Sequence, residues 1–424
     1  MKINIRKSSL VSMLILIFVS FYGLFSRYVG YTGVWNDVIT IIILLLVWTK
    51  GNNWLNKVIK NIFILGSFFM SVIFLSLSVF FSSSNAYIID NLQAILYPLL
   101  ICILVWDMNQ SKAITEFFTI SFGFFNLMWI LNLFVLSRQV TGSGFMIKSE
   151  WLALNNFYPD QCCGLFGNSG THPLGMFSVF ILIYNLYYAN YKAKKKKLLL
   201  AYTFLTEGLM LIYSRLNENM ALFVLLPFFG ALYLLLETEW KSQKISKKII
   251  KYGRYIILFL FLAFVIFQFH GIGDYIRNEL STRINKIISF KVFETNGSNE
   301  RLAIPFYALA NDLGWRFGRG FGSWQIHLSG FLGFRHFGLN SAGSFIALGG
   351  IWFYISYCSL YASLMKEMCY CYVQNRKLWF VCMAVIVALS LYTVIFTSAV
   401  SIIWIAFVFS IFGEMKKEIE KERK

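Results

Sequence analysis

Charged residues are scarce in this chain, and their scarcity limits the class of protein to which it can belong. Only 14% of the 424 residues are Asp, Glu, Lys or Arg, whereas 58% are hydrophobic. A soluble protein of this length needs far more polar surface to cover its core. The composition therefore excludes a soluble globular protein and predicts one integral membrane domain over residues 1–424.

Alternation of polar and apolar residues is also missing. The apolar runs are continuous, which is not the pattern of an outer-membrane β-barrel. A helix needs about 20 mostly apolar residues to cross a hydrocarbon core about 30 Å thick. The sequence therefore predicts an all-α, multi-spanning protein with about twelve transmembrane helices. The predicted spans are Ser9–Phe25, Val38–Thr49, Ile62–Phe81, Leu92–Trp106, Ile114–Leu136, Leu174–Tyr188, Leu198–Tyr213, Met220–Leu236, Tyr255–Phe269, Ser341–Leu364, Trp379–Phe396 and Val400–Phe412.

Lysine is nearly absent from every second gap between these spans. The Lys-rich gaps include Lys57–Lys60, Lys192–Lys197 and Lys241–Arg254, and the C-terminal tail Lys416–Lys424 is also basic. Because Lys and Arg are retained on the cytoplasmic side, both termini are predicted to be cytoplasmic. The net charge of +18 follows mostly from this asymmetry. No basic soluble domain is left to bind nucleic acid, so that function is excluded.

Three further patterns are lacking. The residues after the first span, Ser26-Arg27-Tyr28, contain no small-residue cleavage pattern, so the span is interpreted as a retained anchor. The seven cysteines have no spacing typical of a metal site or a disulfide framework. Outside the spans, the carboxylates Asp274, Glu300 and Asp312 are scattered. We therefore expect neither a metal nor another cofactor.

What the sequence does contain is two long Lys-poor gaps, predicted as external loops over about 137–173 and 271–340. The first is rich in glycine and is predicted to be irregular backbone that folds back over the membrane centre. The second begins with apolar residues at helical spacing between Ile272 and Ile288, which predicts an amphipathic helix on the outer surface. A second helical face follows, with Leu302, Phe306, Leu309 and Leu313.

A glycine-rich segment, Gly314–Gly322, follows that face and contains two arginines. Such a turn can expose backbone N–H groups to an anion. The alternative is a loop that only connects two elements.

Four short patterns in this order resemble the superfamily of bacterial O-antigen polymerases, O-antigen ligases and capsule-repeat polymerases. Gly167-Asn168 precedes one span, and Ser214-Arg215 ends another. Arg301 and a helix are followed by Gly318-Arg319-Gly320-Phe321-Gly322, and His336 with Asn340 precedes a span that contains Gly349-Gly350. The resemblance covers the whole predicted topology.

The resemblance implies a multi-pass protein of the bacterial cytoplasmic (inner) membrane whose active site is on the external side. Its substrates would be oligosaccharide repeats on undecaprenyl diphosphate, in contact with membrane lipid. The enzyme would join a sugar hydroxyl of one repeat to the anomeric carbon of another. A chain-length regulator and a flippase are the further partners that the resemblance implies.

The candidate catalytic residues are Arg215, Arg301 and His336. Arginine binds diphosphate oxygens in a planar fork, so Arg215 and Arg301 are predicted to stabilise the leaving group. The alternatives are a boundary arginine that reaches the interface for Arg215, and a solvated helix face for Arg301. His336 is the predicted general base, or else a hydrogen-bonded structural residue.

The remaining candidates would bind substrate. They are Asn168, Arg319, Gly320 and Gly322 in the loops, Asn340 beside His336, and Glu207 within a span. An intramembrane carboxylate such as Glu207 is functional or paired, and an ion pair that holds spans together is its favoured alternative.

Two other functions stay open. An O-antigen ligase would transfer the finished glycan to lipid A-core with the same chemistry. A lipid-linked-oligosaccharide flippase or transporter would need polar residues spread along many spans. Because the polar residues concentrate in the external loops, the sequence favours an enzyme.

Overall fold

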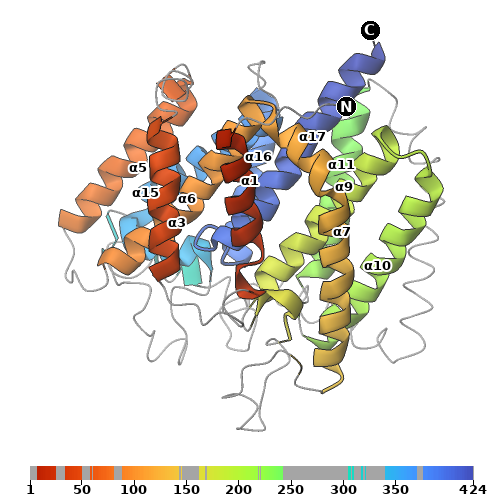
Figure 1. Ribbon diagram of the computed structural model, residues 1–424. Helices are drawn as coiled ribbons and strands as arrows, with labels where there is room; N and C mark the ends of the chain where they lie inside the picture. The colour runs from red at the N-terminus through yellow and green to blue at the C-terminus, as the bar shows by residue number, and fades with distance from the viewer. Residues whose placement is uncertain are drawn as a thin grey trace, which may run out of the picture.

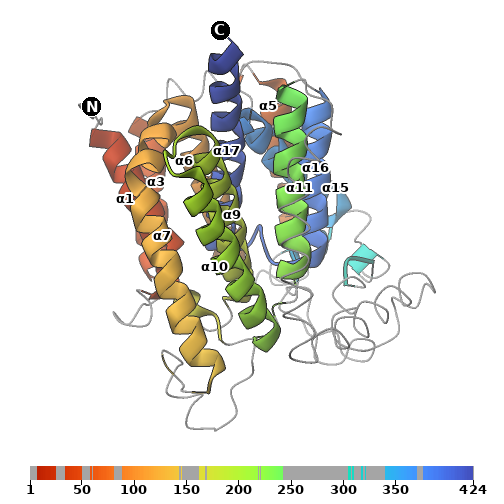
Figure 2. The same ribbon diagram turned by 90° about the vertical axis from the view of Figure 1, so that its right-hand side faces the viewer.

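The computed structural model is a bundle of α-helices (Figures 1 and 2). It describes residues 7–24, 34–49, 58–59, 61–80, 88–142, 145, 162–167, 170–217, 219, 221–241, 304–306, 308–309, 317–318, 320, 340–369 and 376–423. Within these ranges there is no β-strand. The elements are α1 (Lys7–Ser20), α3 (Val34–Thr49), α5 (Ile62–Phe80), α6 (Ile88–Gln110), α7 (Ala113–Val140), the 3-10 helix η2 (Gly164–Phe166), α9 (Thr171–Tyr191), α10 (Lys196–Leu216), α11 (Leu222–Trp240), α15 (Ser341–Cys369), α16 (Arg376–Tyr392) and α17 (Ala399–Arg423).

The helices fit the predicted all-α membrane class. A helix is present at every predicted span except Tyr255–Phe269, which lies outside the described residues. Among the described helices, α5, α6, α7, α15 and α17 are long and apolar enough to cross a membrane. The other helices are shorter or more polar, so the number of crossings stays a prediction.

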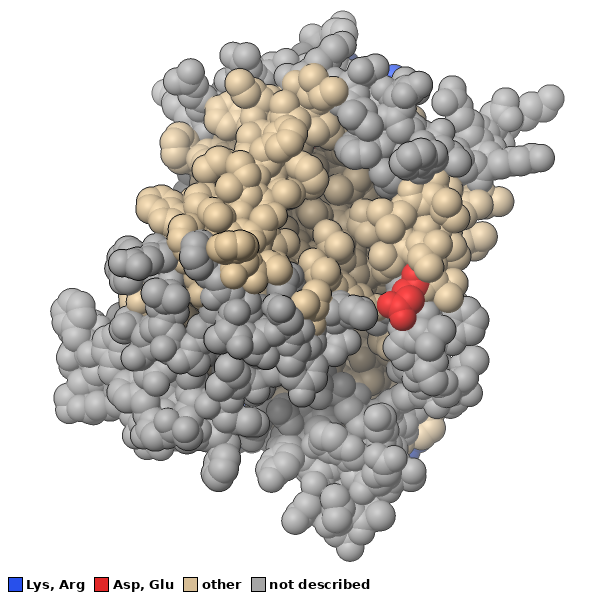
Figure 3. Space-filling model, turned by 90° about the vertical axis from the view of Figure 1, so that its left-hand side faces the viewer, with Lys and Arg blue, Asp and Glu red and all other residues tan. Residues whose placement is uncertain are grey.

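The outermost and innermost helices differ in what covers them. On α5, large apolar side chains such as Phe68, Phe69 and Ile73 are exposed, which fits a lipid-facing surface. Figure 3 shows that the described side chains on this face are almost all uncharged. In contrast, α17 is the most buried of the five candidate spans, and α15 is the next.

Small polar side chains bring α5 and α15 together. The Ser67 and Ser359 hydroxyls lie 2.7 Å apart, and Ser71 donates to the Ser356 hydroxyl at 3.2 Å. Small residues let helix backbones approach closely in an apolar environment, where packing and interhelical hydrogen bonds drive association. This contact fixes α5 against the middle of α15, a helix that contributes to the site described below.

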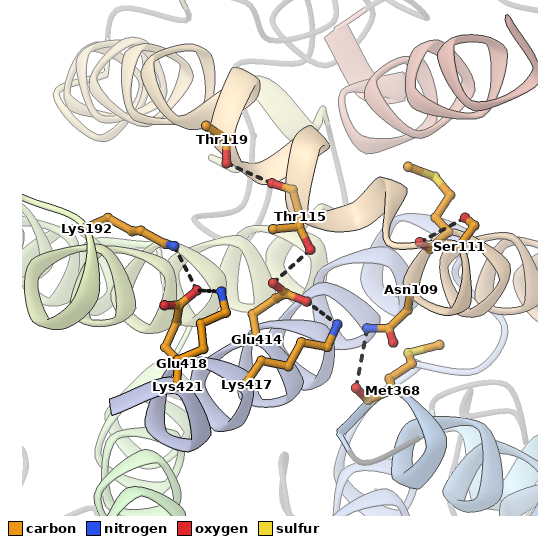
Figure 4. Close-up of polar contacts among 11 residues, drawn as sticks. Asn109, Ser111, Thr115, Thr119, Lys192, Met368, Glu414, Lys417, Glu418 and Lys421 are labelled. Carbon is orange, nitrogen blue, oxygen red and sulfur yellow. Dashed lines mark hydrogen bonds and ion pairs between the residues drawn. The ribbon is translucent and has the colours of Figure 1, made fainter. Parts of the chain in front are cut away.

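One end of the bundle, here called the basic end, is where α9, α11, α15 and α17 end and α7 begins (Figure 4). Glu418 accepts from Lys192 at 2.9 Å and Lys421 at 3.0 Å, and Thr115 donates to Glu414 at 2.8 Å. Asn109 at the end of α6 donates to the Met368 carbonyl at 3.3 Å. The opposite end, here called the loop end, is where these four helices begin.

An aromatic cluster packs α17 against α9, η2 and the end of α1. Trp404 of α17 stacks near Phe177 and Phe180 of α9, with ring centroids 4.6 and 5.1 Å apart. Phe166 of η2 and Phe21 after α1 complete the cluster. Because α17 also lies against α15, the cluster joins the elements of the loop end around one buried helix.

The structure corrects several predicted boundaries. The first helix ends at Ser20 instead of Phe25, and α16 ends at Tyr392 instead of Phe396. Phe396 lies beyond the end of α16, and its N–H donates to the Ser341 hydroxyl at 3.0 Å. The helix α15 is longer than predicted and ends at Cys369.

The amphipathic helices of the second external loop are described only in part. Residues 304–306 and 308–309 are helical. Ile304, Pro305 and Ala308 are buried, whereas Phe306 is exposed. The predicted apolar face, which includes Leu302 and Leu313 outside the described residues, stays a prediction. The helix predicted from Ile272 lies outside the described residues.

Candidate functional site

A buried turn over Cys162–Gly167 lies at the loop end, between the end of α7 and the start of α9. Gly164 and Gly167 have positive φ angles of 61° and 79°, which glycine adopts at low cost. A Cβ on Gly164 would lie 2.2 Å from Asn132 Oδ1, so a larger residue has no room. All six residues are buried. The described part of the first external loop therefore packs into the bundle.

Two amides of α7 hold this turn. The N–H of Gly164 donates to Gln139 Oε1 at 2.8 Å, and the N–H of Leu165 donates to Asn132 Oδ1 at 3.0 Å. Asn132 and Gln139 are seven residues apart, two turns along one helix face. Their amide nitrogens, Nδ2 and Nε2, are buried and have no partner among the described residues. The turn is therefore flanked by two buried amide donors to which no described residue is bonded.

The end of α10 is tied to the same turn. Asn217 Nδ2 donates to the Cys162 carbonyl at 2.8 Å, and Asn219 Nδ2 donates to the Thr171 carbonyl at 3.0 Å. Arg215, the predicted diphosphate ligand, is half-buried in the last turn of α10, two residues before Asn217. The structure therefore brings Arg215 to the loop end, two residues before the Asn217 contact with Cys162.

A break in α15 forms the second part of the site. Gly350 has φ 79° and ψ 178°, a conformation found essentially only in glycine. The Leu348 carbonyl accepts the N–H of Gly320 at 3.0 Å and also the Ser78 hydroxyl. Gly318, with φ 72°, fits so closely that a Cβ would lie 2.7 Å from Ala347 O and from Gly350 N. The Gly318-x-Gly320 segment is thus seated in the break.

This arrangement changes one predicted role. The sequence suggested that the N–H of Gly320 could bind an anion, but the structure gives that N–H to a backbone carbonyl. The reason is the break itself, which frees the carbonyl of Leu348 from the helical pattern. Arg319 and Gly322 lie outside the described residues, so their predicted roles are not affected.

Asn340 caps the start of α15. Its Oδ1 accepts the N–H of Gly343 at 2.6 Å, and its Nδ2 donates to the Leu391 carbonyl at 3.1 Å. The side chain is fully buried. The structure thus gives Asn340 a role in fixing α15 against the end of α16. The predicted contact with His336 or a sugar stays a prediction, because His336 lies outside the described residues.

Glu207 lies in the middle of α10 and is buried. It accepts a hydrogen bond from the Ser178 hydroxyl of α9 at 2.5 Å. The sequence favoured an ion pair for Glu207. Among the described residues no cation pairs with Glu207, and its partner is the neutral hydroxyl of Ser178. Glu207 therefore forms a polar contact between α9 and α10, eight residues before Arg215 along α10.

Several predicted site residues cannot be placed. Asn168, Arg301, Arg319, Gly322 and His336 all lie outside the described residues. Those that are described lie in the loop half of the bundle: Arg215 ends α10, Asn340 begins α15, and Gly320 reaches the α15 break. Phe166 contacts Trp404 near the start of α17, so the two parts of the site share one end of the molecule.

The sequence reasoning missed the amides that organise this end. Asn132 and Gln139 lie in the apolar run of α7, and Asn217 and Asn219 lie in the short α10–α11 connection. A usable signal was Asn132, a polar residue inside the predicted span Ile114–Leu136, with Gln139 seven residues later, three residues past the predicted end. Polar residues within a span are rare and face the bundle interior.

No group of three or more His, Cys, Asp or Glu residues within the described ranges could hold a metal ion. The six cysteines described are all buried. The expectation of a metal-free and cofactor-free reaction stays a prediction.

Comparisons with known proteins add no relative. No family model, curated protein or solved structure matches the chain. The functional conclusion therefore depends on the geometry of the loop end and on the motifs in the sequence.

Proposed function

We propose that this protein is a polymerase that joins undecaprenyl-diphosphate-linked oligosaccharide repeats into O-antigen or capsular polysaccharide. The observation that carries the proposal is the end of the bundle at which the described motif residues lie. Gly167, Arg215, Gly320 and Asn340 are far apart in the sequence, yet all lie in the half of the bundle opposite the basic end. A single site requires its motifs to lie at the same end of the molecule, so this position supports the proposal.

The charge distribution supports an external site. At the basic end, Lys192 at the end of α9, Lys241 after α11 and Lys417 of α17 form ion pairs with the glutamates of α11 and α17. Lysine-rich ends are retained in the cytoplasm. The loop end then faces outward, where lipid-linked repeats are presented for polymerisation.

The chemistry assigns a task to each candidate. The acceptor hydroxyl oxygen attacks the anomeric carbon of the donor sugar while the bond from that carbon to the diphosphate oxygen breaks. Negative charge grows on the diphosphate, and the guanidinium groups of Arg215 and Arg301 stabilise it. His336 takes the proton of the acceptor hydroxyl. Arg215 suits the diphosphate because it lies at a helix end, the depth at which a lipid headgroup is found.

The neighbouring polar groups suit a sugar. Asn168, Arg319 and Gly322 would bind the diphosphate and sugar oxygens from the loops. Pre-organised donors strengthen when water is excluded. No divalent metal is needed where arginines carry the leaving-group charge.

A strain that lacks the gene tests this proposal. If the protein is the polymerase, surface glycans should shorten to a single repeat and full length should return with the wild-type gene. If full-length glycans instead remain on undecaprenyl diphosphate, the protein is a ligase. If single lipid-linked repeats accumulate at the cytoplasmic face, the protein is a flippase, and the polymerase proposal is wrong.

A further inference from the structure

Among the described buried glutamates, Glu207 is the one that has no cation beside it. It is 2% exposed and lies about 17 Å along α10 from Lys196 and about 14 Å from Leu216, at 1.5 Å per residue. Both distances put it well inside the apolar part of the helix. A carboxyl at this depth has no bulk water to solvate it.

The contacts of Glu207 come from neutral groups. Ser178 of α9 donates to Oε2 at 2.5 Å, and Oε1 has no hydrogen-bond partner. Tyr202 on α10 is the titratable neighbour, and its own hydroxyl faces the Asn126 carbonyl of α7 at 3.5 Å. Within the described parts of α7, α9 and α11, which pack against α10, no charged side chain pairs with Glu207.

Two other buried glutamates provide the comparison. Glu237 is equally buried, but Lys241 lies 3.3 Å from it and the Tyr191 hydroxyl donates to it at 3.0 Å. Glu414, also 2% exposed, accepts from Lys417 at 2.6 Å. Both lie at the basic end and both have a cation. Glu207 has burial of the same degree without the cation.

Burial without a cation favours a carboxylic acid at Glu207 over a carboxylate. An ionised carboxylate is an acceptor at both oxygens, and burying it unpaired costs far more than burying a neutral acid. A neutral acid has one carbonyl oxygen that accepts and one O–H that donates. Ser178 satisfies Oε2 as the acceptor, which leaves the proton on Oε1.

We propose that Glu207 and Ser178 form a proton-binding site inside the contact between α9 and α10. The bound ligand is a single proton, carried on Oε1 of Glu207. Loss of that proton would place an uncompensated charge between the two helices, and water would have to enter to solvate it. Ser214 lies seven residues further along the same face of α10, toward the loop end, and its buried hydroxyl has no partner among the described residues.

The site is independent of the polymerase proposal, because it follows from the packing of α9 and α10 alone. Its test uses the purified full-length protein in lipid vesicles without any sugar substrate. Dicyclohexylcarbodiimide enters the apolar layer and reacts with protonated carboxyl groups. The acid proton moves to a carbodiimide nitrogen while the carboxyl oxygen bonds to the central carbon, and rearrangement gives a stable N-acylurea with no leaving group.

Labelling is read by peptide mass spectrometry between pH 6 and pH 8. The proposal predicts an adduct on Glu207 whose rate of formation changes less than about twofold, since the group stays protonated throughout. An ordinary carboxyl loses about tenfold in protonated fraction for each pH unit. No adduct on Glu207, or a tenfold fall in its rate per pH unit, would overturn the proposal. Equal labelling of Glu237 would also overturn it, because the reagent would then report burial alone.

A second measurement does not depend on reagent access. Glu207→Gln replaces a neutral acid with a neutral amide that can still accept from Ser178 and donate from its nitrogen. The proposal predicts an apparent Tm within the error of the wild type, whereas Glu207→Ala loses the contact and melts lower. If Glu207→Gln melts as low as Glu207→Ala, the native group is a charged partner and the proton site is excluded.

Discussion

Gly318→Ala is the substitution for which the structure predicts the clearest loss. The backbone at Gly318 has φ 72°, where an L-residue costs about 1–2 kcal/mol. A methyl group there would also lie 2.7 Å from Ala347 O and Gly350 N, which are backbone atoms that cannot rotate away. The segment must therefore move out of the α15 break.

That movement removes a second contribution. The 3.0 Å hydrogen bond from the Gly320 N–H to the Leu348 carbonyl would be lost, which costs about 0.5–1.5 kcal/mol. The sum is about 1.5–3.5 kcal/mol. Because Gly320 is adjacent to Arg319, we also expect polymer length to fall when the variant is expressed in place of the wild type.

The matched control is Gly230→Ala, which introduces the same methyl group in the middle of α11. No atom lies within 4 Å of that position, so the change should be neutral or stabilise the helix by up to about 1 kcal/mol. The two variants should therefore change the apparent Tm in opposite directions, or only Gly318→Ala should lower it.

Hydrogen exchange tests the stated cause. In the wild type, the amide of Gly320 should exchange slowly because it is bonded to Leu348. In Gly318→Ala it should exchange at least tenfold faster, while peptides of α11 keep their wild-type rates. The reasoning is refuted if Gly318→Ala and Gly230→Ala have the same Tm and Gly320 remains protected.

Four further predictions follow from the two parts of the site and from the charge distribution. Gly167→Ala has steric room, with no contact closer than 3.8 Å, but φ 79° and ψ −176° are unfavourable for alanine, so it should destabilise by about 1–3 kcal/mol in thermal unfolding. Arg215→Lys keeps the charge but loses the planar fork, so most polymer should be lost at normal protein level; full polymer in both Arg215→Lys and Arg215→Ala would reduce it to a boundary residue. His336→Ala should insert normally and lose activity by about 10²–10⁴-fold, and near-normal turnover would remove it as the base. Single cysteines in a Cys-free background should be labelled from outside at Ser143 and from inside at Ala193; the reverse would invert the proposed orientation.

The helices were the part of the structure that the sequence predicted well. Long apolar runs such as those of α5 and α7 leave few other conformations in a membrane, because every backbone group must be bonded within the segment. The ends of the helices were predicted less accurately. Within the predicted span Ser9–Phe25, α1 ends at Ser20, and residues 22–24 are helical again after a turn at Phe21.

The break in α15 was not predictable from hydropathy. Ser341–Cys369 is apolar throughout, and Gly349-Gly350 alone does not distinguish a close helix contact from a break. The break is stable because Gly320 and Ser78, distant in sequence, both donate to Leu348. Such partners are fixed by tertiary packing, which the local pattern does not contain.

The roles of individual polar residues depended on the same long-range information. Glu207 was expected to need a cation, but its partner is Ser178 on the neighbouring helix. Asn340 was predicted from its place beside His336, and the structure adds that its oxygen accepts a free N–H at the start of α15. In both cases the sequence identified a residue under constraint, and the packing determined what satisfies it.

Reconstitution tests the central claim most directly. The purified protein, in vesicles, would be mixed with the lipid-linked repeats extracted from the strain that lacks the gene, in excess EDTA. The account predicts glycans of many repeats and one undecaprenyl diphosphate released for each linkage formed. Repeats that stay single in this mixture, with no undecaprenyl diphosphate released with or without added Mg²⁺, would contradict it.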